Sequence, residues 1–294
     1  LAVNYVQAEN TSDSNYELAS YITYDKEYRT LQLEVGSYDL TSYGNGFRGI
    51  GQGYKHNGTQ TEYAYTKLRS LRLGDRNTQV ALEGNNASIS YTRSIYELED
   101  DKYFIKQAGL FPQLYGHSMT ENYTVQNLTV TGTVQSNVVR TSAKEQPDKD
   151  TYFGIFFANA GYSTAKQVTF KNVSIGDDSL LSGSKYAGGI YACDQWKHDG
   201  LTFSNCSVSG LTIENARWAG GFSGLLENVA VTVVTNGTND KNTIQNTVIK
   251  TRDTACVSNE EKDVNKANAK IRYAGGLFGQ VKQVLKVTGV KVTD

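Results

Sequence analysis

A short motif built around two glycines recurs along the chain. It is clearest as RYAGGLFGQV at 272–281, and it returns as RWAGGFSGLL at 217–226 and KYAGGIYACD at 185–194. Looser forms are TYFGIFFANA and KQAGLFPQLY. Such self-similarity indicates an array of like units, each of which buries its apolar face against its neighbours.

The copies are unequally spaced. The glycine before the apolar pair is residue Gly109, Gly154, Gly189, Gly221 or Gly276, so the intervals are 45, 35, 32 and 55 residues. A helical repeat such as TPR keeps a fixed length, whereas a stack of strands with variable corner loops tolerates this variation. Glycine weakens a strand, so we expect these glycines where φ is positive or where another backbone passes closely.

A second signature follows each glycine motif. It reads YTVQNLTV, VTFKNVSI, LTFSNCSV and LLENVAV, centred on Asn127, Asn172, Asn205 and Asn228, with Ser70 of TKLRSLRL as an N-terminal relative. Apolar residues alternate on both sides of the Asn, but the phase slips by one residue there. Such a slip turns side chains to the other face unless the backbone bends, and Asn tolerates the left-handed conformation of a bend. We therefore expect these Asn, above all the first three, to stack at one corner.

These patterns predict an all-β fold, a single-stranded parallel β-helix (β-solenoid) with irregular corner loops and a polar N-terminal cap. We expect residues 1–30 to form the cap or linker, with one short helix around 16–24, and residues 31–294 to form the solenoid. Residues 235–270 are a polar excursion with one strand-like run, NTVIK. The strand pattern is still running near Asp294, so we expect the native protein to continue beyond it.

An aromatic residue precedes the glycines at one place in several copies. Tyr186, Trp218 and Tyr273 lie two residues before the first glycine of their pair, and Tyr152 is the expected equivalent. Two interpretations stay open: an aromatic stack along the solenoid, or an aromatic strip that holds sugars.

Composition limits the function classes. The 294 residues carry 29 basic and 30 acidic side chains, a net charge of −1, so the basic surface of a nucleic-acid binder is not expected. No apolar run approaches the roughly 20 residues of a membrane span, so no direct membrane insertion is expected. The three cysteines form no C-x-x-C, and His56, His117 and His198 lack metal-ligand spacing, so we predict no metal and no cofactor. Scarce cysteine with abundant Tyr, Thr and Asn favours an exported bacterial protein, extracellular or at the cell surface.

Together the two signatures resemble the GLUG-type repeats of large bacterial surface and adhesin-like proteins. The match is good in AGGLFG and AGGFSG, partial in AGGIYA and loose in FGIFFA and AGLFPQ. The resemblance implies a repeat region of a larger surface protein, found in adhesins and in accessory regions of secreted peptidases. It carries over no catalytic residues.

The loops after the glycine strands are the candidate binding sites. Three consecutive copies have longer segments at 112–122, 158–166 and 192–200, which we expect to form a ridge, because repeat proteins commonly bind through insertions on one face. The alternative is that these loops only cover an edge. The candidate ligand-binding residues are Tyr115, His117, Tyr162, Asp194, Trp196, His198 and Asp199. We expect Trp196 to be the strongest contact, with a glycan or a host extracellular-matrix protein as partner.

The leading function is a non-enzymatic module for adhesion or a stalk. The alternative is a carbohydrate-active enzyme, a polysaccharide lyase or glycoside hydrolase on a parallel β-helix. A glycosidase needs two carboxylates about 5–9.5 Å apart, and the candidate pairs are Asp194 with Asp199 and Asp177 with Asp178. We expect both pairs to be turn residues, and Cys206 to be a buried apolar residue rather than a nucleophile.

Overall fold

The computed structural model describes a large part of the chain. These residues are 2–4, 21–41, 49, 52–56, 61–65, 81–95, 104–105, 107–114, 122–136, 151–160, 166–194, 199–235, 241–251 and 273–293.

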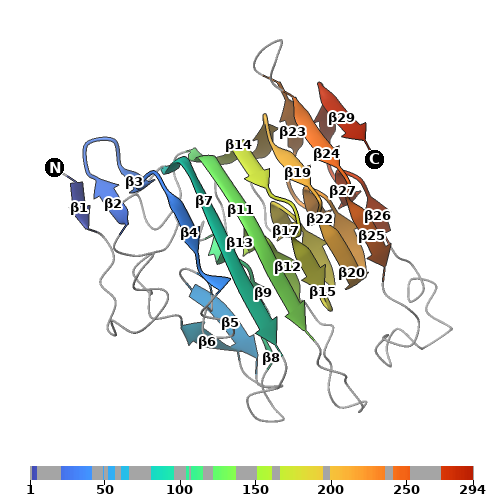
Figure 1. Ribbon diagram of the computed structural model, residues 1–294. Helices are drawn as coiled ribbons and strands as arrows, with labels where there is room; N and C mark the ends of the chain where they lie inside the picture. Colours follow the sequence, from blue (N-terminus) through green and yellow to red (C-terminus); the bar gives the residue numbers. More distant parts are fainter. Residues whose placement is uncertain are drawn as a thin grey trace.

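The described residues form four sheets (Figure 1). Sheet 1 contains β1 (Ala2–Asn4), β2 (Ile22–Asp25), β3 (Thr30–Leu33), β4 (Ser37–Asp39), β7 (Ala81–Ile95), β11 (Tyr123–Ser136), β14 (Gln167–Ile175), β15 (Leu180–Ser182), β18 (Gly200–Ser204), β19 (Ser207–Ser209), β20 (Thr212–Ala216), β23 (Val231–Val234), β24 (Asn242–Gln245), β25 (Val248–Thr251), β28 (Leu285–Val287) and β29 (Val290–Thr293). Sheet 2 contains β9 (Gln107–Ala108), β12 (Tyr152–Gly154), β16 (Tyr186–Gly188), β21 (Trp218–Gly220) and β26 (Tyr273–Gly275). Sheet 3 contains β10 (Phe111–Leu114), β13 (Phe157–Ala160), β17 (Tyr191–Asp194), β22 (Ser223–Leu226) and β27 (Phe278–Val281). Sheet 4 contains β5 (Gln52–His56), β6 (Thr61–Tyr65) and β8 (Phe104–Ile105).

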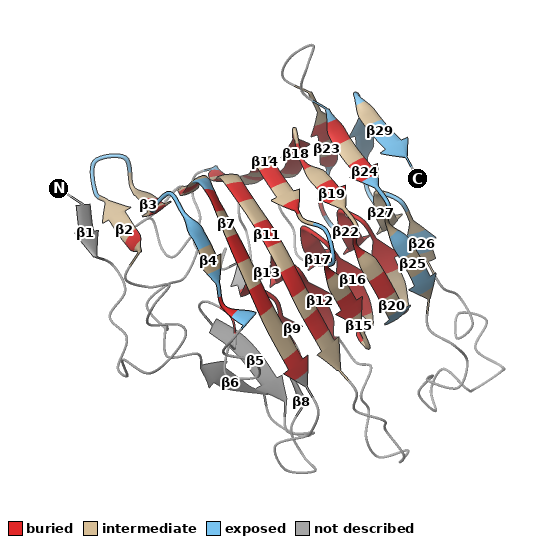
Figure 2. Cartoon of the chain, in the orientation of Figure 1, coloured by how far each residue is buried: buried red, intermediate tan, exposed pale blue. Residues whose placement is uncertain are grey.

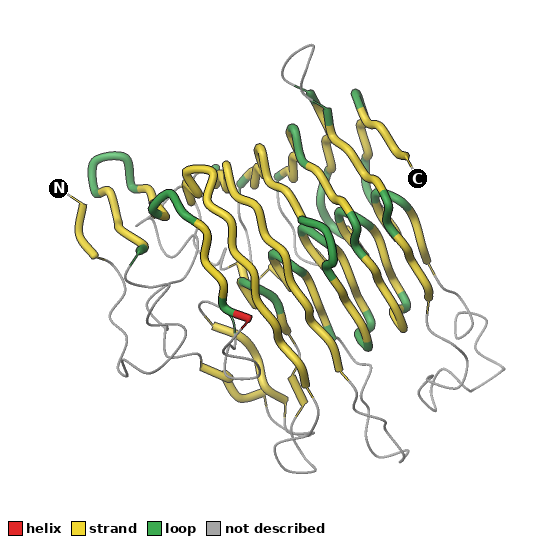
Figure 3. Tube along the Cα trace, in the orientation of Figure 1, coloured by secondary structure: helices red, strands yellow, loops and turns green. Residues whose placement is uncertain are grey.

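The chain is all-β and its sheets are mainly parallel. From β9 onward each repeat copy passes from sheet 2 to sheet 3 and then to sheet 1, and each strand pairs in parallel with its equivalents in adjacent copies, as β12 does with β16 and β13 with β17. Apart from the single 3-10 residue Thr41, the described residues contain no helix, so strands fill Figure 3. No described helix has the length and apolarity needed to cross a membrane. In the described part of the chain, no sheet closes on itself.

The N-terminal strands depart from the parallel pattern. β1 pairs antiparallel with β2, and β2 pairs antiparallel with β3, which then joins β7 in parallel. The helix expected around 16–24 is wrong over its described part, because 21–24 is the turn and strand that begin this hairpin. Backbone pairing with β3 outweighs the weak helical preference of that segment.

The Asn corner lies where sheet 1 bends. Asn127, Asn172 and Asn205 have φ of 58°, 53° and 51°, and each sits between two short runs of alternating burial. Asn172 Nδ2 donates to Asn127 Oδ1 at 2.8 Å, and Asn205 Nδ2 donates to Asn172 Oδ1 at 2.8 Å. The left-handed Asn thus bends the backbone at the point where the alternation shifts by one residue. Apolar residues on both sides of the corner therefore reach the core.

The fourth Asn expected in this column lies elsewhere. Leu226 pairs with Asp194 at the end of sheet 3, and exposed Asn228 lies in the turn before β23. Strand β23 is the partner of β18, so the run LLENVAV spans the end of one sheet and the start of another. Ser70, the expected N-terminal relative, lies outside the described residues.

The true N-terminal counterpart of the corner is Asn85 and Asn86. Both have positive φ, 51° and 59°, and the register between β7 and β11 shifts beside Asn127 to accommodate two extra residues in β7. The polar excursion at 235–270 also contains more structure than expected. Two strands, β24 and β25, lie within it and pair with β19 and β20.

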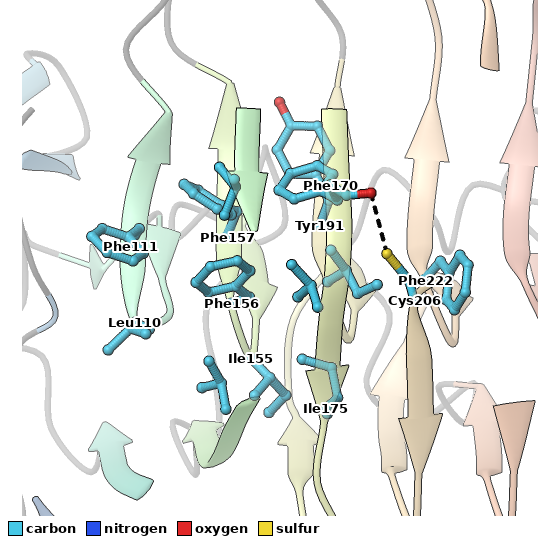
Figure 4. Packing of buried hydrophobic residues seen from close by; sticks show 14 of the residues in the cluster. Leu110, Phe111, Ile155, Phe156, Phe157, Phe170, Ile175, Tyr191, Cys206 and Phe222 are labelled. Atoms are coloured by element: carbon cyan, nitrogen blue, oxygen red, sulfur yellow. Dashed lines mark hydrogen bonds between the residues drawn. The ribbon is translucent and has the colours of Figure 1, made fainter. Parts of the chain in front are cut away.

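Apolar columns fill the space between the sheets. Phe111 and Phe157 stack at 5.2 Å between ring centroids, as do Phe170 and Phe203 at 5.5 Å. Cys206 is fully buried among them and its thiol approaches the Phe170 carbonyl at 3.4 Å (Figure 4). Burial is greatest in the middle copies and falls in the last strands (Figure 2).

Two glycine positions are required for two different reasons. The glycines that end the sheet 2 strands face a carbonyl of their own copy, so that a Cβ on Gly188 would overlap the Tyr191 carbonyl oxygen. Here the chain turns sharply from sheet 2 into sheet 3. The glycine one residue later faces the next copy, and a Cβ on Gly189 would lie 2.5 Å from the Gly221 carbonyl oxygen. The strand register pairs Gly154 with Gly188. The sequence motifs had matched Gly154 with Gly189, so that match was wrong by one residue.

Gly276 does not have the close contact expected from the sequence. The nearest atom to a Cβ there would be Val292 Cγ1 at 3.9 Å, and its φ is not positive. The reason is that the second glycine is constrained only by the following copy, and no described strand lies beyond β26.

We expect Gly189→Ala to lower the free energy of unfolding by about 2–4 kcal/mol, because a backbone carbonyl at 2.5 Å must shift. Gly276→Ala is the matched control and should change it by less than about 1 kcal/mol. Urea unfolding monitored by circular dichroism measures both. Equal losses in the two variants would contradict this explanation of the second glycine.

Burial also makes Cys206 a source of pH-dependent stability. Desolvation raises the pKa of its thiol from the ordinary 9.0 to about 12. The contribution of this thiol to the free energy of unfolding is complete below pH 9 and is lost as pH rises toward the folded pKa. In this pH range the thiol ionises in the unfolded chain but stays protonated in the folded chain. From pH 8 to pH 10 the wild type should lose about 1.4 kcal/mol more than Cys206→Val, measured by urea unfolding. Parallel pH profiles for the two proteins would contradict this.

Candidate functional site

The described residues include only part of the candidate ridge. Tyr115, His117, Tyr162, Trp196 and His198 lie outside them. Asp199 is exposed at a bend before β18, whereas Asp194 is the last residue of β17 and only 1% exposed. The expected placement of Asp194 in a polar loop is therefore wrong, because sheet 3 runs further along the chain than the sequence suggested.

Asp194 is held by neighbours within its own sheet. The Tyr191 hydroxyl donates to Asp194 Oδ2 at 3.4 Å, and the backbone N–H of Glu227 donates to the Asp194 carbonyl at 2.8 Å. Its main chain thus links one copy to the turn of the next. These contacts give Asp194 a structural role at the end of β17.

The other acidic pair lies in a turn, as the sequence predicted. Asp177 and Asp178 are exposed, and Asp178 has φ of 65°. Asp177 Oδ1 accepts a hydrogen bond from the Ser209 hydroxyl of the next copy. Among the described residues, no three His, Cys, Asp or Glu side chains converge in a way that would hold a metal ion.

The aromatic column runs along the outer face of sheet 2. Its rings stack in succession, with centroid distances of 5.1 Å from Tyr152 to Tyr186, 4.9 Å to Trp218 and 5.5 Å to Tyr273. Tyr152 and Tyr186 are only 2% and 4% exposed. Ring faces that cover each other cannot also cover a sugar, so within the column only ring edges are available to a ligand.

Apolar residues of sheet 3 pack beneath this column. Ala158, Ala192, Cys193 and Leu225 form a second apolar cluster with the aromatic residues, separate from the main core. Sheets 2 and 3 are therefore in contact on their outer side as well as through the core. Both faces of these strands are buried, which explains why their sequences lack simple alternation.

Polar groups surround the exposed part of the column. The Arg217 guanidinium lies 4.4 Å from the Trp218 ring centroid, and Lys185 Nζ lies 5.7 Å from it. Trp218 Nε1 donates to Gln280 Oε1 at 3.0 Å. The ring faces of Trp218 thus contact neighbouring rings and cations, and its indole N–H donates a hydrogen bond to the next copy.

The Asn ladder ends at a carboxylate in the N-terminal direction. Asn127 Nδ2 lies 3.0 and 3.1 Å from the two oxygens of Glu83, and Gln126 Nε2 donates to Glu83 at 2.7 Å. Glu83 Oε1 also accepts from the backbone N–H of Asn85 at 2.7 Å. This carboxylate terminates a structural chain of amides, a role that the sequence analysis missed because Glu83 lies in a run outside the quoted repeats.

A small hollow lies at the same N-terminal end of sheet 1, around β4 and the turn that precedes it. It is lined by Tyr21, Glu34, Val35, Gly36, Ser37, Tyr38, Asp39 and Leu40. The Tyr38 hydroxyl donates to the Glu34 carbonyl at 2.7 Å, and partial burial with the nearby Glu34 charge raises the pKa of Tyr38. Hydrogen bonds from the Thr41 hydroxyl and N–H lower the pKa of Asp39. The Tyr38 hydroxyl and the Asp39 carboxylate of this hollow are therefore already engaged by the protein.

No protein-family model, no curated protein and no solved structure matches the chain.

We expect the Asn ladder to stabilise the fold measurably. Asn172→Ala should lower the free energy of unfolding by about 2–4 kcal/mol, from two lost hydrogen bonds and a left-handed alanine. Asn172→Gly removes the same amide without the φ penalty and should cost about 1–3 kcal/mol. Asn246 has φ of 49° in an exposed turn, so Asn246→Ala is a control for φ alone. If Asn172→Gly leaves the urea midpoint unchanged, the ladder does not stabilise the protein.

Proposed function

We propose that this chain is a non-enzymatic repeat module of a bacterial surface or secreted protein, acting in adhesion or as a stalk. The fold that we propose for it is a single-stranded parallel β-helix of GLUG-type repeats. The order in which the chain visits sheets 2, 3 and 1, with in-register parallel pairing between copies, supports this architecture. The antiparallel β1–β2–β3 strands support an N-terminal cap around residues 1–30, with the repeats following from residue 31.

The observation that carries the functional proposal is the use of polar and aromatic side chains for contacts between copies. The three Asn of the corner bond one another, Asp177 bonds Ser209, and the four aromatic residues stack. Side chains that bond or stack between copies stiffen the array and are not available to a ligand. Ligand recognition then depends on the loops and the ends of the array. An extracellular or cell-surface location, as one part of a larger protein, follows from this proposal.

The binding part of the proposal keeps the ridge as its site. Asp199, directly before β18, is the candidate residue of the ridge that is exposed among the described residues. Trp side chains dominate many binding hot spots, and a flat ring suits a sugar or a peptide aromatic. The expected partner is a glycan or a host extracellular-matrix protein.

The test is binding of the purified chain to a glycan array and to a panel of matrix proteins. Trp196→Ala should abolish binding to any ligand found while leaving the melting temperature within about 2 °C, the shift of a small stability change. Tyr28→Ala, at a side chain 66% exposed and outside the ridge, is the matched control and should bind normally.

Two outcomes would count against the proposal. Sugar release from any polysaccharide in a reducing-end or unsaturated-product assay would favour the enzyme. If Trp196→Ala binds as the wild type does, the ridge is not the site and the stalk role remains.

A further inference from the structure

Two cationic residues lie side by side where the chain bends from sheet 1 into sheet 2. Lys185 lies in the bend directly before β16, and Arg217 lies in the bend directly before β21. The backbone N–H of Arg217 donates to the Lys185 carbonyl at 3.0 Å, so the two residues hold equivalent places in adjacent copies. We call this pair the cation ledge. Its two side chains start about one strand spacing apart, about 4.8 Å.

The fold does not require a cation at this place. In the preceding copy the place is held by Thr151, which is 3% exposed and whose hydroxyl accepts from the Lys185 N–H at 2.9 Å. The aromatic column passes this copy unchanged, with Tyr152 stacked on Tyr186. Like charges at neighbouring places on adjacent strands destabilise each other. An anion placed beside both cations would remove that cost.

The aromatic column holds the two cations in place. The Arg217 guanidinium lies 4.4 Å from the Trp218 ring centroid, and Lys185 Nζ lies 5.7 Å from the same centroid and 5.4 Å from that of Tyr186. Such contacts are attractive and reduce the freedom of long side chains. A guanidinium packed on a ring can still direct its N–H fork at a carboxylate. The rings are thus the platform that orders the cations, and the cations are the groups offered to a ligand.

A neutral donor lies beside this platform. The Trp218 indole N–H can only donate, and it donates to Gln280 Oε1 at 3.0 Å, which fixes the orientation of the Gln280 amide. The amide NH₂ is then turned away from the indole, and no described residue accepts a hydrogen bond from it. The two preceding copies hold Leu225 and Cys193 in this column, so the amide departs from an apolar pattern.

These donors suit a carboxylate-bearing glycan better than a peptide. Strand β16 pairs with β12 and β21, and β21 pairs with β16 and β26, so neither strand offers a free backbone edge to which a peptide strand could add. A polysaccharide needs only side-chain donors, and Arg binds a carboxylate in bidentate geometry. The net charge of −1 does not favour a nucleic acid, whose affinity grows with the number of phosphates neutralised.

We propose that the cation ledge and Gln280 bind a uronic-acid unit of a linear acidic polysaccharide. The Arg217 fork binds the carboxylate, the Lys185 ammonium neutralises the charge, and the Gln280 NH₂ donates to a carboxylate or hydroxyl oxygen of the sugar. This site lies outside the ridge at 112–122, 158–166 and 192–200, so it is an addition to the binding role proposed above.

Fluorescence anisotropy of a labelled oligogalacturonate with the full chain tests the proposal. The matched neutral probe is the same oligosaccharide with its carboxylates methyl-esterified. The free acid should bind at least about tenfold more tightly, because hydrogen bonds to a charged group are stronger than those to a neutral one. This preference should shrink as NaCl is raised, since the cations are only partly buried.

Variants separate loss of the site from loss of folding. Arg217→Gln should weaken binding of the free acid about tenfold. Gln280→Glu should abolish it, because the new carboxylate still accepts from the Trp218 N–H but repels the ligand. Lys250→Gln removes the same charge from a strand of sheet 1 and should bind normally. Melting temperatures check that each variant is folded.

Four outcomes would overturn the proposal. One is equal binding of the free acid and its methyl ester by the wild type. Another is unchanged binding by folded Arg217→Gln and Gln280→Glu. Loss of binding in Trp196→Ala would assign the oligosaccharide to the ridge, whereas intact binding in that variant is expected. Equally tight binding of poly-glutamate would show that the site takes acidic chains in general and not a glycan.

Discussion

The left-handed corner at Asn127, Asn172 and Asn205 is the constraint on which the rest of sheet 1 depends. A strand that kept strict alternation through the corner would expose half of its apolar residues, because a one-residue slip exchanges the two faces. Positive φ at the Asn lets the chain bend, so that Phe170 before the corner and Val173 after it are both fully buried. The amide ladder then joins adjacent corners, and Glu83 accepts its last hydrogen bond.

The corner and the glycine turn stabilise the stack in complementary ways. At the corner, copies attract one another through side-chain hydrogen bonds. At the turn from sheet 2 to sheet 3, copies approach so closely that side chains are excluded, as at Gly189. Each copy therefore needs its neighbour to satisfy its polar groups and to cover its apolar residues, which is the energetic basis of repeat arrays.

Much of this architecture could be predicted from the sequence. The phase slip identified the Asn corner, and the shared place before the glycines identified the aromatic column. The errors occur where strands are buried on both faces: β17 and β22 have no exposed residue, so no alternation marks where they end. For that reason the sequence placed Asp194 in a loop and aligned LLENVAV with the corner. Whether a Cβ fits at Gly276 depends on contact with a neighbouring copy, which the residues next to it in the sequence do not reveal.

The candidate site was less predictable than the fold because repeated residues serve the stack first. By type and spacing, Tyr186 and Trp218 suited either an aromatic stack or a sugar-binding strip, and in the structure their faces are turned toward each other. A side chain that recurs in every copy has an identical neighbour above and below, and those neighbours saturate it. Chemistry available to a partner must then lie where the recurrence fails.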